Sequence, residues 1–304
     1  MLNIEDIKKL HKEHPFPKEV SDIRERILNS FNDLKFDPVP HTYLVESGIG
    51  LGVELRSVSS FVESFSPKED WDAIAERYAA KNGLTVPSVK RMWKENNIRS
   101  TNNGTSTHLF LESYMWFFLN MPYKIDPIIL PQYEDGYLIP YGPKQEAGAK
   151  YFQDLYDSYY NDAISIKVYP VMPETRMYVF DKNKFGMKTR FAGTMDILLA
   201  YCDPYDNKWK LICDDWKTNK SLYNDYNRKN GCYLDYPFND IINEPIGHYQ
   251  IQLSSYTLML RQLDYDVTAR NLVWLKDDSK YERHQLKDLS ERILEYDKFI
   301  NNKS

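Results

Sequence analysis

Three β-like runs follow one another in the second half of the chain, and they constrain the fold more than any other feature. They are rich in Val, Ile, Tyr and Phe, which strands favour, and they cover residues 167–180, 189–201 and 208–215. The segment between the last two, Asp-Pro-Tyr-Asp-Asn, has turn chemistry. A helix over 246–263 and a strand over 270–276 come next. This order predicts an α/β fold with a central mixed β-sheet flanked by helices.

The first hundred residues predict an N-terminal helical extension that packs on this core. Residues 1–35 and 56–100 have helical spacing of apolar residues in several pieces, and residues 41–55 have the pattern of a β-hairpin. The sequence therefore predicts an extension over residues 1–100 and an α/β core over residues 101–304.

Helix boundaries within the core follow from polar and breaking residues. The segment 102–105, Asn-Asn-Gly-Thr, interrupts the helical pattern, and a new apolar-rich helix is expected from about Ser106 to Leu119. Residues 121–143 hold five prolines and predict a loop or an insertion. Further helices are expected over 144–163 and 286–300.

Cysteine and charge exclude several classes of protein. The three cysteines form no C-x-x-C pair, so a disulfide framework, a structural zinc site and a four-cysteine iron–sulfur cluster lack suitable ligands. The N-terminus is charged and has no signal-peptide core, and no stretch of about 18 apolar residues occurs. We expect a cytoplasmic protein without a membrane partner. The net charge of -5 excludes a strongly basic nucleic-acid coat protein, although it permits a local basic groove.

Two aspartates and a lysine lie near the ends of neighbouring predicted strands. Asp215 and Lys217 are two positions apart and share a face of their strand. A hairpin brings Asp196, on the preceding strand, beside Asp215. Two close carboxylates repel each other, and a divalent cation such as Mg²⁺ or Mn²⁺ relieves that repulsion. A lysine there can stabilise charge on a phosphate, as phosphodiester hydrolysis requires, although a lone Asp-x-Lys is more often a simple salt bridge.

Further polar residues surround this pair in the predicted fold. His108 begins the helix expected after residue 105, and Glu112 follows one turn later on the same face. Glu174 precedes Asp196 by one strand. On the 246–263 helix, Gln252 and Tyr256 form an i,i+4 pair that can hydrogen-bond the site or a DNA phosphate. Taken singly, each has an ordinary structural interpretation as a core, capping or surface residue.

Together these residues carry a resemblance to a known family. The chain contains, in this order, GTSTH at 104–108, PETR at 173–176, AGTMD at 192–196, DDWKT at 214–218 and QLSSY at 252–256. It resembles the PD-(D/E)XK nuclease superfamily, and within it the RecB-like branch and its phage-type exonucleases. The segments His41–Tyr43 and Ser57–Ser59 and the residue Trp93 also fit, so the likeness spans residues 41–275.

The resemblance implies a restriction-endonuclease-like core and cleavage of DNA that depends on Mg²⁺ or Mn²⁺. Carried over by position, the metal ligands are His108, Asp196, Asp215 and the carbonyl of Trp216. Lys217 becomes the catalytic lysine, and Glu174 serves a second metal or orients a water. The residues expected to support the site or to contact DNA are Glu112, Thr218, Lys220, Gln252 and Tyr256.

The departures from the family concern cofactors and partners. Some relatives carry a four-cysteine iron–sulfur cluster, which is not expected here. No G-x-x-x-x-G-K-[ST] run occurs, so the chain acts alone or with a separate helicase or single-strand annealing protein.

Charge distribution bears on how DNA is held. Residues 208–229 hold six basic and three acidic residues, and residues 81–99 hold five basic and one acidic. We expect the two to line a groove that follows phosphates without reading sequence, although 81–99 can also be a solvated helix face.

The favoured function is a sequence-nonspecific exonuclease in phage-type DNA recombination, replication or processing. Alternatives are a structure-specific or nicking endonuclease and a catalytically silent DNA-binding protein. A threading arch would favour the exonuclease, and the sequence shows none.

Overall fold

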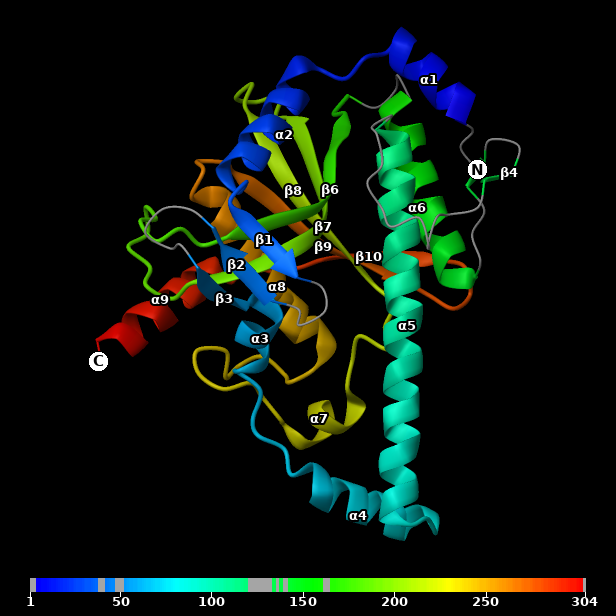
Figure 1. Cartoon of the computed structure of the whole chain (residues 1–304), viewed down its shortest axis with the longest axis vertical. Helices are drawn as coiled ribbons and strands as arrows, with labels where there is room; N and C mark the ends of the chain where they lie inside the picture. The colour runs from blue at the N-terminus through cyan, green and yellow to red at the C-terminus, as the bar shows by residue number, and fades with distance from the viewer. Residues whose placement is uncertain are drawn as a thin grey trace.

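The molecule is built on a mixed β-sheet flanked by helices, as the sequence predicts (Figure 1). The computed structural model describes residues 4–37, 42–46, 52–119, 133–134, 137–138, 142–160 and 165–302. Its eight-stranded sheet has the order β1-β2-β3-β7-β8-β9-β10, and β6 pairs with the opposite edge of β7. The pairs β3–β7 and β8–β9 are parallel, and the other pairs of this sheet are antiparallel.

The described residues form a main sheet of eight strands, a second sheet of two strands, and helices around them. The strands of the main sheet are β1 (Leu34–Asp37), β2 (Thr42–Val45), β3 (Val53–Ser57), β6 (Val168–Tyr178), β7 (Phe191–Cys202), β8 (Trp209–Lys217), β9 (Val267–Leu275) and β10 (Tyr281–Gln285). A separate two-stranded sheet is formed by β4 (Tyr133–Glu134) and β5 (Tyr137–Leu138). The helices are α1 (Ile4–Glu13), α2 (Lys18–Ser30), α3 (Val58–Glu63), α4 (Trp71–Asn82), α5 (Val86–Phe118), α6 (Pro143–Tyr160), α7 (Asp225–Asn230), α8 (Pro245–Arg261) and α9 (Ser290–Asn301).

Two hydrophobic cores lie on opposite faces of the sheet, because alternate residues of a strand point to opposite sides. On β7, Leu198 and Ala200 belong to the core that also contains side chains of α3, α8 and α9, whereas Ile197 and Leu199 belong to the core under α5 and α6. A Cβ atom added to Gly148 of α6 would lie 2.1 Å from Leu111 of α5, so this glycine permits the close packing of the two helices.

The same alternation separates the neighbouring aspartates of β8. Asp214 points toward α6, where it accepts hydrogen bonds from Tyr151 (2.8 Å), Asn271 (2.7 Å) and Arg283 (3.0 Å). Asp214 is fully buried, and these three donors compensate its charge. Asp215 points toward the opposite face, together with Lys217.

We expect Tyr151→Phe to lower the free energy of unfolding by about 1.5–3 kcal/mol, because it removes a hydrogen bond to a buried charged acceptor. Tyr281→Phe is the matched control, because its hydroxyl donates to the exposed Asp154 and its loss should cost no more than about 0.5 kcal/mol. Urea unfolding of both variants measures the difference. Equal losses of unfolding free energy in the two variants would mean that the buried hydrogen bond from Tyr151 to Asp214 stabilises the fold no more than an exposed one.

The break predicted at residues 102–105 is wrong, because α5 runs without interruption from Val86 to Phe118. An interior glycine costs a helix about 1 kcal/mol, which tertiary packing can offset. Here Gly104 lies against the body of the protein, with the Thr218 hydroxyl 3.4 Å from the position that a Cβ atom would take. The boundary suggested at residue 100 therefore falls inside a helix.

The N-terminal region contributes to the main sheet. The expected hairpin is present as β2 and β3, while β1, which pairs with β2, was not predicted, and neither were β10 and α7. Because β3 pairs with β7, the hairpin is continuous with the central sheet. Most of the Pro-rich segment 121–143 lies outside the described residues. Among the helices that are described, none combines the length and apolar character needed to cross a membrane.

Candidate functional site

The site forms where the central sheet forks. Pairing between β7 and β8 ends at Ile197 and Asp214, and the same edge of β7 is next taken up by β3 at Phe191 and Ala192. Among the described strands, none pairs with residues 193–196 on this edge. The fork therefore leaves the backbone groups of residues 193–196 without a strand partner on this edge.

Side chains satisfy the backbone groups that the fork leaves open. The Asp196 carboxylate accepts a hydrogen bond from the Trp216 N–H at 2.8 Å. The Tyr256 hydroxyl donates to the Thr194 carbonyl at 2.8 Å, and the Gln252 amide donates to that hydroxyl at 3.2 Å. A Cβ atom at Gly193 would lie 2.8 Å from the Tyr256 ring, so glycine is required for this approach. The predicted Gln252 and Tyr256 pair thus supports the fork.

Three predicted residues converge at the fork. His108 on α5, Glu174 on β6 and Asp196 on β7 each offer a ligand atom, and these atoms all lie within 4.8 Å of one another. His108 Nδ1 is 3.5 Å from Asp196 Oδ1. This group of one imidazole and two carboxylates can hold a metal ion. It lines a cavity of about 500 Å³ that Gly104, Thr105 and Glu112 also border.

Asp215 and Lys217 form the second part of the site. Lys217 Nζ lies 2.5 Å from Asp215 Oδ2, which confirms that the two share a face of β8. Both Asp215 oxygens are buried, and within the described chain Oδ1 has no hydrogen-bond partner while Oδ2 contacts the Lys217 ammonium. A buried carboxylate oxygen without a hydrogen bond is costly, and a bound cation would compensate it. Asp215 lies outside the group formed by His108, Glu174 and Asp196.

The backbone at Glu174 is strained. Its φ angle is +45°, in the left-handed region that a residue with a side chain rarely adopts. The residue lies inside β6, between Pro173 and Thr175, which pair with Ile197 and Met195. Strain of this kind persists where surrounding structure enforces it and often marks functional sites. Here it accompanies a carboxylate that lies beside Asp196.

The ionisation of these groups reflects a surplus of buried negative charge. Burial opposes protonation of His108, but the Asp196 carboxylate more than offsets this and raises the His108 pKa to about 9. Burial and then Asp196 raise the pKa of Glu174 to about 8. Burial and Asp196 also raise the pKa of Asp215 to about 6, in spite of Lys217. Protons and Lys217 thus neutralise a cluster that a divalent cation would neutralise as well.

The remaining predicted residues lie around this centre. Glu112 accepts a hydrogen bond from Trp116 at 3.2 Å and borders the cavity, and burial raises its pKa. Thr218 and Lys220 border a second cavity of about 420 Å³ with Arg99 of α5. Trp216 contributes its N–H to Asp196, and coordination of a metal by its carbonyl stays a prediction.

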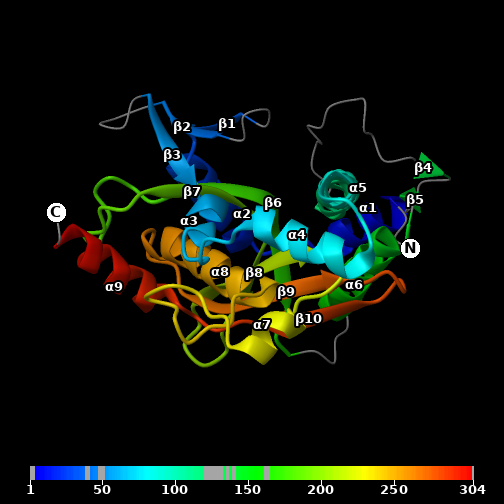
Figure 2. The ribbon, with the colours of Figure 1, turned by 90° about the horizontal axis from the view of Figure 1, so that it is seen from below.

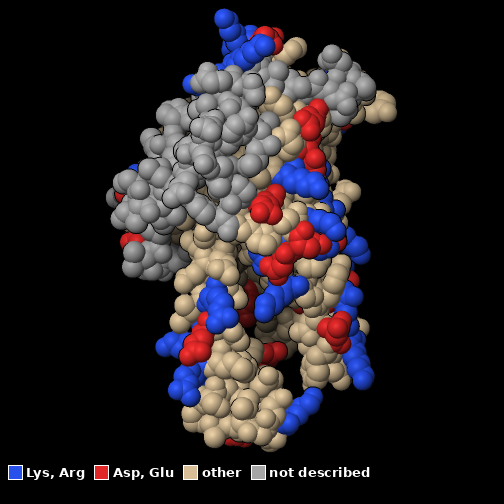
Figure 3. All heavy atoms as spheres, turned by 90° about the vertical axis from the view of Figure 1, so that its right-hand side faces the viewer, with Lys and Arg blue, Asp and Glu red and all other residues tan. Residues whose placement is uncertain are grey.

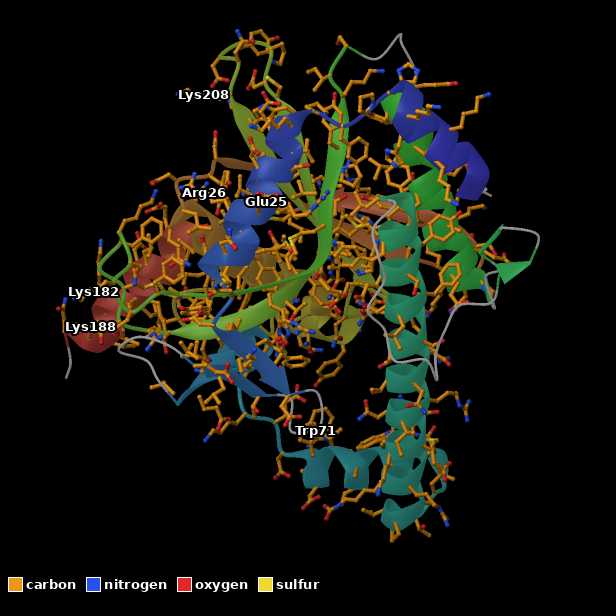
Figure 4. All side chains as sticks on the ribbon, turned by 45° about the horizontal axis from the view of Figure 1, so that its top comes forward. Glu25, Arg26, Trp71, Lys182, Lys188 and Lys208 are labelled. Atoms are coloured by element: carbon orange, nitrogen blue, oxygen red, sulfur yellow. The ribbon has the colours of Figure 1, made fainter. Side chains whose placement is uncertain are left out.

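The expected basic groove is only partly present. Lys208 lies at the end of the molecule opposite Trp71 of α4 (Figure 4), and Lys210 is held by Asp203 at 2.6 Å. Lys208 and Lys210 begin β8, whereas the site lies at its end, so the expectation that the whole 208–229 run surrounds the site is wrong. Of the basic residues in this run, Lys217 pairs with Asp215 at the site and Lys220 borders the neighbouring cavity of about 420 Å³.

Tyr249 was not predicted as a site residue. Lys217 Nζ lies 4.9 Å from the centre of the Tyr249 ring, whose hydroxyl donates to Asn219 at 2.6 Å. A signal was available, because Tyr249 lies three residues before Gln252 and seven before Tyr256, on the same helix face.

Metal binding should stabilise the protein if the His108, Glu174 and Asp196 group holds the ion. Mn²⁺ at 100 times its Kd would stabilise the wild type by about 2.7 kcal/mol, and EDTA should reverse the rise in Tm. Glu174→Gln should reduce this rise, whereas Glu112→Gln should largely retain it, because Glu112 is not one of the three converging groups. Equal rises in both variants would contradict the assignment.

Comparison with known proteins adds nothing to this geometry, since no family model and no curated protein matches the chain.

Proposed function

We propose that the protein is a metal-dependent deoxyribonuclease that hydrolyses phosphodiester bonds. The observation that supports this most is the meeting of two groups at the sheet fork. His108, Glu174 and Asp196 form a ligand set, and Asp215 with Lys217 places an ammonium beside a buried carboxylate. The order of these residues along the chain also resembles that of the PD-(D/E)XK nucleases.

The donor set fits Mg²⁺ or Mn²⁺. Carboxylate oxygens suit these ions, and a single imidazole is compatible with Mn²⁺ in particular. His108, Glu174 and Asp196 would hold the ion, with the ion pair of Asp215 and Lys217 beside them. When bound, the ion supplies Lewis-acid polarisation of the scissile phosphate and lowers the pKa of the attacking water.

The protein's own groups then have separable tasks. The Lys217 ammonium, fixed by Asp215 and the Tyr249 ring, stabilises negative charge that develops on the phosphate. Glu174, at its strained position, would be one of the ligands of the ion. Gln252 and Tyr256 hold the fork open through Thr194, and so they position the site.

We propose further that cleavage is sequence-nonspecific and begins at a DNA end. The cavity next to the site is lined by groups that contact phosphates, namely Lys220 and Arg99, with hydroxyl and amide side chains between them. Readout of sequence would require side chains placed in a groove of duplex DNA.

The test is digestion of end-labelled linear DNA and covalently closed circular DNA with Mg²⁺, Mn²⁺ or EDTA. We expect metal-dependent loss of linear DNA while the closed circle stays intact. Cutting of the circle would favour the endonuclease. Binding of DNA without cleavage of either substrate would favour a catalytically silent protein.

A further inference from the structure

A helical projection, which we call the arm (residues 67–103), stands away from the body of the protein. It comprises the linker from α3, all of α4 and the first half of α5 (Figure 1). Seen from below, α4 spans from the region of α3 to the end of α5 (Figure 2). The arm is therefore attached at both ends and forms a closed loop with the body.

Both limbs of the arm are exposed to solvent. Residues 67–72 of the linker and residues 94–103 of α5 are all exposed. A helix that lies on a protein surface buries one side at every turn. Ten consecutive exposed residues mean that nothing in the described chain covers this part of α5. Space therefore remains between each limb and the body.

The tip of the arm has a small core of its own, which keeps the loop in shape. Ala75 and Ala79 of α4 pack against Val89 of α5. Trp93 makes edge contacts with Trp71 and Tyr78, at ring distances of 6.2 and 5.8 Å. Such a core makes α4 and α5 a rigid hairpin rather than a loose loop.

Both attachments are firm. At the α3 end, Phe61 stacks on Phe191 at 4.6 Å and Phe65 contacts Phe238 at 4.8 Å. At the α5 end, Tyr114 stacks on Phe152 of α6 at 5.4 Å. The loop thus stays closed while the native core is intact.

The limbs face one segment of the body, which directly follows Lys217. A cavity of about 830 Å³ lies between the linker and this segment and includes Lys68, Trp71, Asn219 and Tyr249. The cavity of about 420 Å³ lies between the α5 limb and the same segment, and it also includes Asn219. In the space-filling view the lower half of one face is hollowed (Figure 3).

The lining of this opening suits a single nucleic acid strand. Lys68, Arg99 and Lys220 provide cations for phosphates, and Trp71, which is 62% exposed, provides a surface on which a base can stack. Trp71 lies where the linker enters α4, below the sheet (Figure 4). Two of the acidic residues at the edge are paired, since Arg228 binds Glu244 at 2.8 Å and Lys144 lies 3.4 Å from Asp277, and Glu63 and Glu69 also line the linker cavity.

The opening leads to the metal group. Gly104 and Thr105, which follow the exposed span of α5, line the cavity of His108, Glu174 and Asp196. On α8, Tyr249 borders the linker cavity, while Gln252 and Tyr256, on the same helix face, border the metal cavity. A strand that passes under the arm would therefore follow α8 from one cavity into the other.

We propose that a single-stranded DNA end threads through the opening between the arm and the body and reaches the metal group in this way. The proposal rests on the proposed nuclease function. The exposed span of α5 is about 15 Å long at a rise of 1.5 Å per residue, which is less than the width of a DNA duplex. Duplex DNA is thus too wide for the opening, and what enters it is a free single-stranded end, either of a single strand or of an overhang on linear duplex DNA.

Threading is tested by trapping, which needs no cleavage. A single-stranded oligonucleotide with biotin at both ends is mixed with the protein in EDTA, and streptavidin is added before or after the protein. Threading predicts at least tenfold weaker binding when the ends are blocked first. It predicts at least tenfold slower dissociation, under challenge with competitor DNA, when they are blocked afterwards.

The control is the same protein with its loop opened. A protease site inserted at Gly83, the turn between α4 and α5 with open space around it, allows the arm to be cut without a change at the metal group. Cutting leaves α4 and α5 joined only by the small core at the tip, which can open to release a strand, so dissociation should become faster. Dissociation that is as slow after cutting as before it, or unaltered dissociation of the intact protein after capping, would overturn threading.

A parallel cleavage assay with Mg²⁺ keeps the two proposals apart. Cleavage of free-ended strands without trapping would overturn threading and leave the nuclease proposal standing. Trapping without cleavage of any DNA would overturn the nuclease proposal and support the passage as a DNA-binding ring.

Discussion

Lys217→Ala should lower the rate of DNA cleavage by about 10²–10³-fold, the loss typical when one preorganised group that stabilises transition-state charge is removed. Lys217 is 15% exposed and lies 2.5 Å from Asp215. Burial favours its neutral form, but the Asp215 and Asp196 carboxylates outweigh this and raise the pKa of Lys217 above its usual range. The ammonium therefore stays charged at neutral pH. Rates with linear DNA and saturating Mn²⁺ measure the effect.

Lys210→Ala is the matched control for this variant. Lys210 also lies on β8, is 16% exposed and pairs with an aspartate, Asp203, but it is at the far end of the strand. We expect its rate to be close to that of the wild type. Lys217→Ala should still bind Mn²⁺, because Lys217 supplies no ligand. A Lys217→Ala rate within tenfold of the wild type would remove the lysine from the mechanism.

The order and type of the main elements were predictable because each strand carries a strong local pattern. The runs that became β6, β7 and β8 are dense in β-branched and aromatic residues, and both faces of β7 are buried. By contrast, β10, Tyr-Glu-Arg-His-Gln, is polar and forms a strand through pairing with β9. Such a strand depends on its neighbour and has no signal of its own.

The continuity of α5 was not predictable from its sequence. Asn102, Asn103 and Gly104 are poor helix formers, and local propensity favours a break there. The helix continues because its two halves are fixed by different partners, α4 at one end and α6 with the sheet at the other. This tertiary constraint is also what creates the arm, so the sequence could not reveal a threading loop.

Some features of the candidate site were predictable from the sequence, and others were not. The shared face of Asp215 and Lys217 follows from the period of two in a strand, and the ion pair confirms it. That His108, Glu174 and Asp196 meet could not follow from spacing, because it depends on how β7 and β8 diverge. The resemblance implied His108, Asp196 and Asp215 as metal ligands and gave Glu174 a separate role, whereas the structure places Glu174, and not Asp215, in the group within 4.8 Å.

Asp196→Asn should weaken Mn²⁺ binding by more than about 100-fold, since loss of residues that merely orient ligands already costs 10–100-fold. Asp196 has the central place at the fork, because it contacts both His108 and the Trp216 N–H. An asparagine can keep the hydrogen bond to Trp216, so the fold should persist. Isothermal titration with Mn²⁺ measures the affinity, and the Tm without metal reports the fold.

The sign of the stability change makes this variant informative. Burial raises the pKa of Asp196, but His108 outweighs this and keeps that pKa below its usual value, so the metal-free Asp196→Asn protein should lose this ion pair and be less stable than the wild type. Asp203→Asn, just beyond the other end of β7, removes a carboxylate that pairs with Lys210 and should leave Mn²⁺ affinity unchanged. Loss of affinity in both variants would indicate a general disturbance of the sheet. Undiminished affinity in Asp196→Asn would show that the cation binds elsewhere, and the proposed mechanism would then fail at its first step.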